Sequence, residues 1–177
     1  LSAAIEASLS NMKTDVIDLY QIHRPDILAH PQEVARVLDD AVAAGKIRAL
    51  GVSNFTLHQT VALNHFLGHK LVSTQPEISP LRIEAIWSPL GGGRLVSPES
   101  ARDKAVAAEL DRVATEQGVS RSVAAYSWLM AHPAGIIPII GSQQTSRIAE
   151  GADAFNVKWT RTDWYAVLVA ARGVPLP

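Results

Sequence analysis

The feature that most constrains the fold is a regular alternation of short apolar strands with amphipathic helices. Aliphatic-rich runs at 16–22, 47–52 and 70–75 have the length of buried strands, and helical patterns at 31–44 and 56–67 separate them. A further helix is expected at 1–11, where Leu1, Ile5 and Leu9 share one face. Strands that alternate with helices predict βαβ units, a parallel sheet and an α/β protein.

The second part of the chain continues this alternation with more helix. We expect strands at 85–88 and 136–140, and helices at 101–116, 120–131 and 160–172. Another helix is expected to run through 155, capped by Thr145 or Ser146. Because no low-complexity linker interrupts the chain, the sequence predicts a single domain over residues 1–177.

One junction departs from the βαβ rule. Only residues 78–84 separate the predicted strands at 70–75 and 85–88, whereas a crossover between parallel strands needs about a dozen residues. Either these strands are not parallel neighbours, or this chain lacks a crossover that the natural protein possesses, and we favour the second interpretation. The first helix begins at Leu1 without a capping residue, which suggests that other residues precede it.

The composition narrows the class of function. With a net charge of −1 and no basic run, the chain has no electrostatic footprint for nucleic acid. The apolar run at 136–140 is far shorter than the roughly 18 residues of a membrane span. There is no cysteine, so disulfides, thiol nucleophiles and thiolate metal sites are excluded, as is typical of a cytoplasmic protein.

Polar side chains follow the first two predicted strands. His23 comes after the first strand, and Ser53 and Asn54 come after the second. Active sites of parallel α/β proteins lie at the carboxyl ends of the strands, so these residues are candidates for one site. The alternative for His23 is a histidine that closes a strand end, and for Ser53 and Asn54 it is a helix cap before Thr56.

The histidines do not predict a metal site. His58, His65 and His69 share a region, but Gly68 interrupts the helical spacing and no carboxylate lies near them in sequence. We therefore expect no metal ligands.

Five sequence blocks, taken together and in this order, resemble the aldo-keto reductase family. The blocks are DLYQIHRPD from Asp18, GKIRALGVSNF from Gly45, QPEISPL from Gln75, WSPLGGGRL from Trp87, and IPIIGS from Ile137 with Arg147. They span nearly the whole chain, and the match is to a bacterial branch of oxidoreductases. Any one block alone would be weak support.

The resemblance implies a (β/α)₈ TIM barrel that reduces aldehydes or ketones with NADPH, with NADH less favoured. Such a barrel needs about 250 residues, so this chain would supply about its C-terminal five strands. The family's catalytic tetrad is an Asp, a Tyr, a Lys and a His, and only the His has a counterpart, His23. Tyr20 is not taken as the proton donor, because the family's tyrosine comes from elsewhere.

The resemblance also assigns roles along the cofactor. Ser53, Asn54 and Gln75 would hold the nicotinamide carboxamide, because amide side chains offer the reciprocal donors and acceptors. Trp87 would stack on the ring, with a core tryptophan as its alternative. Ser88, Leu90 and Gly92 would belong to the pyrophosphate loop, which is otherwise a flexible turn.

The adenosine end of the cofactor would lie at the last of the five sequence blocks. Gly141, Ser142 and Arg147 match the site for the 2′-phosphate, and Glu150 is a candidate partner of adenine. Two departures stand out: the family often has a lysine where Gly141 stands and an asparagine where Gly151 stands. The alternative for Arg147 is an ordinary cation on a helix surface.

The sequence therefore favours an NADPH-dependent reductase that acts on small-molecule carbonyl substrates. The alternative is a regulatory or interaction module of the same fold that binds the nicotinamide cofactor without turnover. If the chain were complete as it stands, the open edges of its sheet would promote aggregation or pairing, and we would expect no reductase activity.

Overall fold

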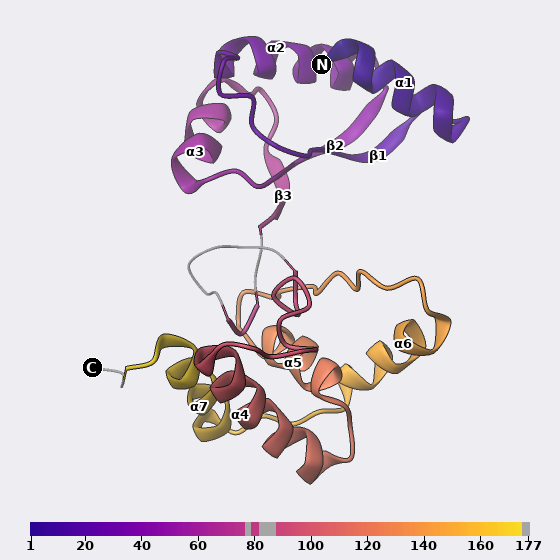
Figure 1. Cartoon of the computed structure of the whole chain (residues 1–177). Helices are drawn as coiled ribbons and strands as arrows, with labels where there is room; N and C mark the ends of the chain where they lie inside the picture. The colour runs from indigo at the N-terminus through magenta and orange to yellow at the C-terminus, as the bar shows by residue number, and fades with distance from the viewer. Residues whose placement is uncertain (77–78, 82–87, 175–177) are drawn as a thin grey trace. The chain divides into compact units, whose positions relative to one another are not determined.

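The computed structural model describes residues 1–76, 79–81 and 88–174 (Figure 1). Contacts divide the chain into two compact units, Leu1–Pro76 and Glu77–Pro177. Each unit contains its own buried apolar clusters. The single domain predicted over residues 1–177 stays a prediction.

The first unit is a three-stranded parallel sheet with its helices. The strands are β1 (Ile17–Ile22), β2 (Ile47–Ser53) and β3 (Leu71–Gln75), in the order β1-β2-β3. The helices are α1 (Ser2–Met12), α2 (Pro31–Ala43) and α3 (Leu57–Phe66). The βαβαβ order predicted from the first half of the sequence is confirmed.

Local sequence signals explain where the helices of this unit begin. Pro31 occupies the first turn of α2, and the His30 side chain accepts a hydrogen bond from the Gln32 N–H. Thr56 caps α3 in a reciprocal capping box with Gln59. Because Thr56 supplies this cap, the capping role that Ser53 and Asn54 had as an alternative is taken by another residue.

The core of the first unit lies between the sheet and its helices. Ile5 and Leu9 of α1 and Leu38 of α2 pack with Ile47 and Leu50 of β2. A second cluster joins α2, β2 and α3 through Ala35, Val52 and Leu63. β2 is therefore the central strand in packing as well as in hydrogen bonding.

The second unit is helical in its described part. It contains α4 (Ala101–Gln117), α5 (Arg121–Met130), α6 (Thr145–Glu150), the 3₁₀ helix η1 (Gly151–Phe155) and α7 (Arg161–Arg172). Its largest apolar cluster includes Leu81, Leu95, Leu110, Trp128 and Val167. The Trp128 and Trp164 rings stack at 4.6 Å, and each indole N–H donates to the other residue's carbonyl.

Two predicted features of the second unit were wrong. Residues 136–140 are irregular rather than a strand, and Ile137 and Ile139 are 85% and 54% exposed. A strand requires hydrogen-bonded neighbours, and the described residues provide none for this segment. Likewise, α6 has Gln144 at its cap position without a side-chain cap bond, so neither Thr145 nor Ser146 caps it.

The prediction of five strands is therefore confirmed only for three. Residues 85–87 of the fourth predicted strand lie outside the described residues. Within residues 1–76, 79–81 and 88–174, no helix is both long and apolar enough to cross a membrane.

Candidate active site

The three strands of the first unit deliver the predicted site residues to one edge of the sheet. His23 follows β1 directly, Ser53 and Asn54 lie at the end of β2, and Gln75 ends β3. The register pairs Ile22 with Val52, and it pairs Ser53 with Gln75. Because parallel strands point the same way, these residues come together at the carboxyl edge.

Hydrogen bonds connect the three strand ends. Asn54 Nδ2 donates to the His23 carbonyl at 2.7 Å and to Ser53 Oγ at 3.1 Å. The Gln75 carbonyl accepts from both Ser53 Oγ at 3.0 Å and the Asn54 N–H at 3.2 Å. Asn54 has a left-handed backbone with φ 60°, a conformation that asparagine tolerates better than most residues. Asn54 thus links the ends of β1 and β3, through its side-chain amide to His23 and through its backbone N–H to Gln75.

This arrangement leaves specific polar atoms available for a ligand. Asn54 Oδ1 and the Gln75 carboxamide have no hydrogen-bond partner among the described residues. Ser53 is buried with 5% exposure, whereas His23 is exposed. The edge therefore offers both donors and acceptors to an amide-bearing ligand, and the exposed His23 follows a strand that ends at the same edge.

Gly51 is required by the close packing of β2 between its neighbours. A Cβ built at Gly51 would lie 2.3 Å from Ser73 Oγ and 2.9 Å from Gln21 Cγ. Such distances leave no room for a side chain. Ser73 Oγ is buried and has no hydrogen-bond partner within the described part of the chain. Close packing of β2 against its neighbours therefore explains the glycine of the GVSNF block, which lies two residues before Ser53.

The glycine turn of the second unit was predicted to belong to the pyrophosphate loop. Gly91, Gly92 and Gly93 all have left-handed backbones, with φ of 60°, 67° and 89°. The Gly92 N–H donates to Ser88 Oγ at 2.8 Å. This bond leaves the Ser88 hydroxyl proton free to be donated outward, whereas the Gly92 N–H is already engaged.

Two arginines fix the residues that follow this turn, and we did not predict either. Arg94 donates from Nε and Nη2 to the two carboxylate oxygens of Asp103 in α4. Arg121 Nη1 donates to the Leu95 carbonyl at 2.9 Å. The sequence contained a signal for the cap of α4, because Ser100 and Asp103 have the spacing of a helix cap and its third residue, but none for the contact with Arg94.

The residues predicted for the adenosine end lie on and before α6. Ser142 Oγ accepts from the Gln144 N–H at 3.1 Å, which closes a turn before the helix. Arg147 is exposed and Glu150 is half-buried. Tyr126 of α5 is buried, and this burial raises the pKa of its hydroxyl; nearby Glu150 raises it further and Arg147 opposes the rise. Tyr126 therefore lies close to the charges of α6.

The two departures from the family pattern differ in their surroundings. A Cβ at Gly151 would lie 2.2 Å from Ile140 Cδ1, the far end of a side chain that would have to shift. At Gly141 nothing lies within 4 Å of the added Cβ. The structure explains neither departure.

Several expectations are not tested by this geometry. Trp87 lies outside the described residues. His23, Ser53, Asn54 and Gln75 belong to the first unit, whereas Ser88, Leu90, Gly92, Gly141, Ser142, Arg147 and Glu150 belong to the second. Each half of the predicted cofactor site is therefore described by itself.

No group of three metal-ligating side chains gathers anywhere in the described ranges. His69 has a carboxylate partner that is distant in sequence, because its Nδ1 lies 2.8 Å from Asp39 Oδ1 of α2. Burial opposes ionisation of Asp39, but the hydrogen bonds from His69 and the Gly68 N–H outweigh it, so its pKa is lowered.

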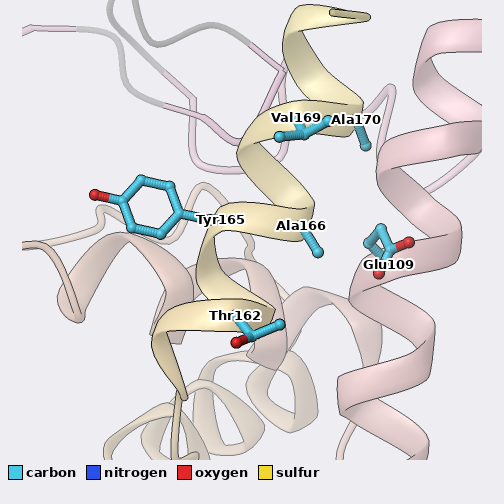
Figure 2. Close-up of a pocket in the computed structure, with 6 residues that line it drawn as sticks. All are labelled: Glu109, Thr162, Tyr165, Ala166, Val169 and Ala170. Carbon is cyan, nitrogen blue, oxygen red and sulfur yellow. The ribbon is translucent and has the colours of Figure 1, made fainter. Parts of the chain in front are cut away.

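An open groove lies apart from the predicted residues of the second unit. It runs between α4 and α7 and is lined by Glu109, Thr162, Tyr165, Ala166, Val169 and Ala170. Figure 2 shows Ala166 and Ala170 pointing toward the Glu109 side, with Tyr165 on the other side of α7. None of the predicted cofactor residues lines this groove.

Comparison with known proteins identifies close relatives. The chain is 69% identical to a 6-dehydroglucose reductase of Novosphingobium aromaticivorans, a match that covers all of this chain and 64% of that protein. A 6-dehydroglucose reductase of Agrobacterium fabrum is 38% identical, over 98% of this chain and 63% of the relative. The chain thus spans about 64% of the length of these relatives.

The alignment with the Novosphingobium protein extends over 194 residues, more than the 177 of this chain. That relative therefore has internal residues without a counterpart here. A crossover absent from 78–84 would account for such a difference.

A solved structure of the thermostable aldo-keto reductase Tm1743, in complex with the inhibitor epalrestat, has the same fold. Its TM-score is 0.80 at 21% identity, over 94% of this chain and 64% of that chain. The sequence profile of the Aldo/keto reductase family matches residues 1–168. The resemblance found in the sequence is thereby confirmed, and the chain belongs to the aldo-keto reductase family.

Proposed function

We propose that the whole protein is an NADPH-dependent reductase of aldehyde or ketone carbonyls, built on a complete (β/α)₈ barrel. The observation that carries this proposal is the connected edge formed by His23, Asn54 and Gln75. Three parallel strands end there, and their hydrogen bonds leave amide atoms available beside an accessible imidazole. The family's reductase relatives favour an enzyme over a non-catalytic cofactor-binding module.

The first unit would hold the nicotinamide end of the cofactor. Asn54 Oδ1 accepts from the carboxamide N–H, and the Gln75 side chain supplies the reciprocal donor and acceptor. Ser53 is committed to the Gln75 carbonyl, so it supports the clamp rather than contacting the ligand. Trp87 would cover the ring as an aromatic face. When bound, the cofactor supplies the hydride.

His23 would orient the substrate carbonyl. A neutral imidazole donates one hydrogen bond to the oxygen, which becomes more negative as the carbonyl is reduced. Its exposure and its position after β1 allow it to meet a substrate above the sheet edge. The proton donor of the reaction would be the family tyrosine, for which this chain has no counterpart.

The second unit would hold the phosphates. The Ser88 hydroxyl and the backbone at Leu90 are the donors of the glycine turn, while Gly92 shapes the turn because its own N–H is engaged. Ser142, Gly141 and Arg147 would bind the 2′-phosphate, since a guanidinium and a hydroxyl both favour a dianion. Glu150 would accept from the adenine amino group. This set favours NADPH over NADH.

The substrate would be an oxidised sugar. The 69% identity to a 6-dehydroglucose reductase supports 6-dehydroglucose, whose carbon 6 is an aldehyde, as the substrate. We assign the enzyme to the cytoplasm, a location that the absence of cysteine supports.

The direct test is turnover by the whole protein. We expect NADPH absorbance to fall only when 6-dehydroglucose or another aldehyde is present, with NADPH preferred to NADH. We also expect NADPH to quench tryptophan fluorescence. Quenching without turnover of any carbonyl would favour the binding module, and failure to bind either nucleotide at millimolar concentration would refute both functions.

A matched pair of variants tests the carboxamide clamp. Asn54→Gly removes the amide but retains the freedom to adopt φ 60°, whereas Asn54→Ala also strains the backbone. Both variants should lose about tenfold in NADPH affinity, because one good ligand hydrogen bond contributes about 1.4 kcal/mol. Unchanged affinity in Asn54→Gly would remove Asn54 from the cofactor site.

A further inference from the structure

The glycine turn at 91–93 has little intrinsic rigidity. An added Cβ at Gly92 or Gly93 would meet nothing within 4 Å, so neighbouring side chains do not restrain these two positions. Glycine also loses more conformational freedom on ordering than any other residue. A turn of three glycines can bind a ligand tightly only if other contacts hold its shape beforehand.

The strongest of these contacts is the pair between Arg94 and Asp103. Arg94 follows the glycines directly, and its guanidinium binds both carboxylate oxygens, the bidentate geometry that fixes orientation as well as distance. Asp103 is only 3% exposed, and its N–H donates to Ser100 Oγ in the cap of α4. The turn is therefore tied to the first turn of a long helix.

A second contact holds the next residue. Arg121 of α5 donates to the Leu95 carbonyl, while its Nε and Nη2 bind Asp111 of α4 at 2.7 and 2.5 Å. Leu95 itself is buried in the core of the second unit. Two consecutive residues after the glycines are thus fixed to α4 through separate arginines.

Only some of the backbone N–H groups of the turn have a hydrogen-bond partner. The Gly91 N–H donates to the Ser88 carbonyl and the Leu95 N–H to the Leu90 carbonyl. Gly92 is engaged by Ser88 Oγ. Within the described residues, the N–H groups of Leu90 and Gly93 have no partner. Gly93 has a left-handed backbone, and an unpaired N–H in such a turn is suited to bind a phosphate oxygen. Leu90 offers a second N–H at the start of the turn.

We propose that Arg94 is a positioning residue for the cofactor pyrophosphate: its pair with buried Asp103 holds the glycine turn so that Leu90, Gly93 and the Ser88 hydroxyl face the phosphates. This inference rests on the proposed function. Arg94 acts through the turn, because Nε and Nη2 bind the two oxygens of the buried carboxylate and so fix the residue that follows the glycines. The pair thereby preorganises the site before the cofactor arrives.

The test measures NADPH affinity of the whole protein by tryptophan quenching in Asp103→Asn and Arg94→Gln. Both variants break the bidentate pair, and we expect each to weaken NADPH binding by about tenfold through lost preorganisation. Arg94→Lys retains the charge and one contact, so its affinity should fall between those of Arg94→Gln and the unaltered protein.

A second ligand separates positioning from general damage. Adenosine 2′-monophosphate lacks the pyrophosphate, so calorimetry should give the same affinity for it in Asp103→Asn as in the unaltered protein. The matched control is Arg112→Gln, which removes ion pairs to Glu109, Glu116 and Asp163 away from the turn. That control should lower the melting temperature but leave NADPH affinity unchanged.

The outcomes are distinct. If Asp103→Asn binds NADPH as well as the unaltered protein does while Arg94→Gln binds it weakly, Arg94 contacts phosphate itself and the positioning role is refuted. An equal loss of affinity for NADPH and for adenosine 2′-monophosphate would mean that the pair of Arg94 and Asp103 has only a structural role. If the unaltered protein binds NADPH and no variant changes that affinity, only this inference fails. If the unaltered protein does not bind NADPH, the proposed function fails with it.

Discussion

The two units hold their halves of the predicted cofactor site by different means. In the first unit the site residues end three paired strands, and bonds to the His23 and Gln75 carbonyls join them. In the second unit the site residues lie in loops and in the short helix α6, and arginine–carboxylate pairs with α4 hold the glycine turn. Sheet register therefore positions one half, whereas long-range side-chain contacts position the other.

The largest expected effect is on chemistry at the first unit. His23→Ala should lower kcat of the whole protein by about a hundredfold or more, because it removes one donor to the developing oxyanion. Its stability should be unchanged, since the side chain is exposed. Steady-state kinetics with denaturant unfolding measures both. A variant that retains full kcat would mean that His23 only ends a strand.

The next effect contrasts the packing around two glycines. Gly51→Ala should lower the free energy of unfolding by about 2 kcal/mol, because its Cβ would overlap Ser73 and Gln21 in the centre of the sheet. Gly141→Ala, in open space and without positive φ, should change it by no more than about 0.5 kcal/mol. Urea denaturation measures the difference. Equal changes in the free energy of unfolding would show that the packed strand at Gly51 and the open loop at Gly141 do not differ in this way.

A smaller effect is expected on cofactor preference in the second unit. Arg147→Gln should weaken NADPH binding by about fivefold, because a charge-assisted bond to the 2′-phosphate is lost. NADH has no 2′-phosphate, so its affinity should stay the same and serves as the internal control. Fluorescence titration with both nucleotides gives the ratio. Parallel loss of both affinities would assign Arg147 a structural role in α6.

The smallest effect concerns the link between α4 and α7. Thr160 and Arg112 donate hydrogen bonds to the Asp163 carboxylate and lower its pKa. A lowered folded-state pKa stabilises the protein above the unfolded value, and this stabilisation is lost as the pH falls below about 4. Asp163→Asn should therefore cost roughly 0.5–1 kcal/mol at neutral pH.

The measurement for this link is thermal melting across pH. The difference between Asp163→Asn and the unaltered protein should shrink as the pH falls below about 4. Glu99→Gln, at an exposed carboxylate with no ion pair among the described residues, should show no such trend. A difference in melting temperature that stays constant with pH would show that ionisation of Asp163 does not contribute to the stability.

The first half of the fold was predictable because its signals are local. The aliphatic runs predicted β1, β2 and β3, and the spacing of Leu1, Ile5 and Leu9 predicted one face of α1, on which Ile5 and Leu9 are buried and Leu1 is exposed. The prediction failed at 136–140, where an apolar run indicated a strand. A strand depends on neighbours that a local pattern does not contain, and the described residues provide none.

The sequence by itself determined the family, the alternation of strands and helices, and the placement of His23, Asn54 and Gln75 at strand ends. It could do so because side-chain periodicity and turn residues act over a few positions. Only the tertiary structure decided that Asn54 binds the His23 carbonyl, 31 residues away, and that Arg94 binds Asp103. Such partners meet only when packing brings separate elements together, so no local pattern specifies them.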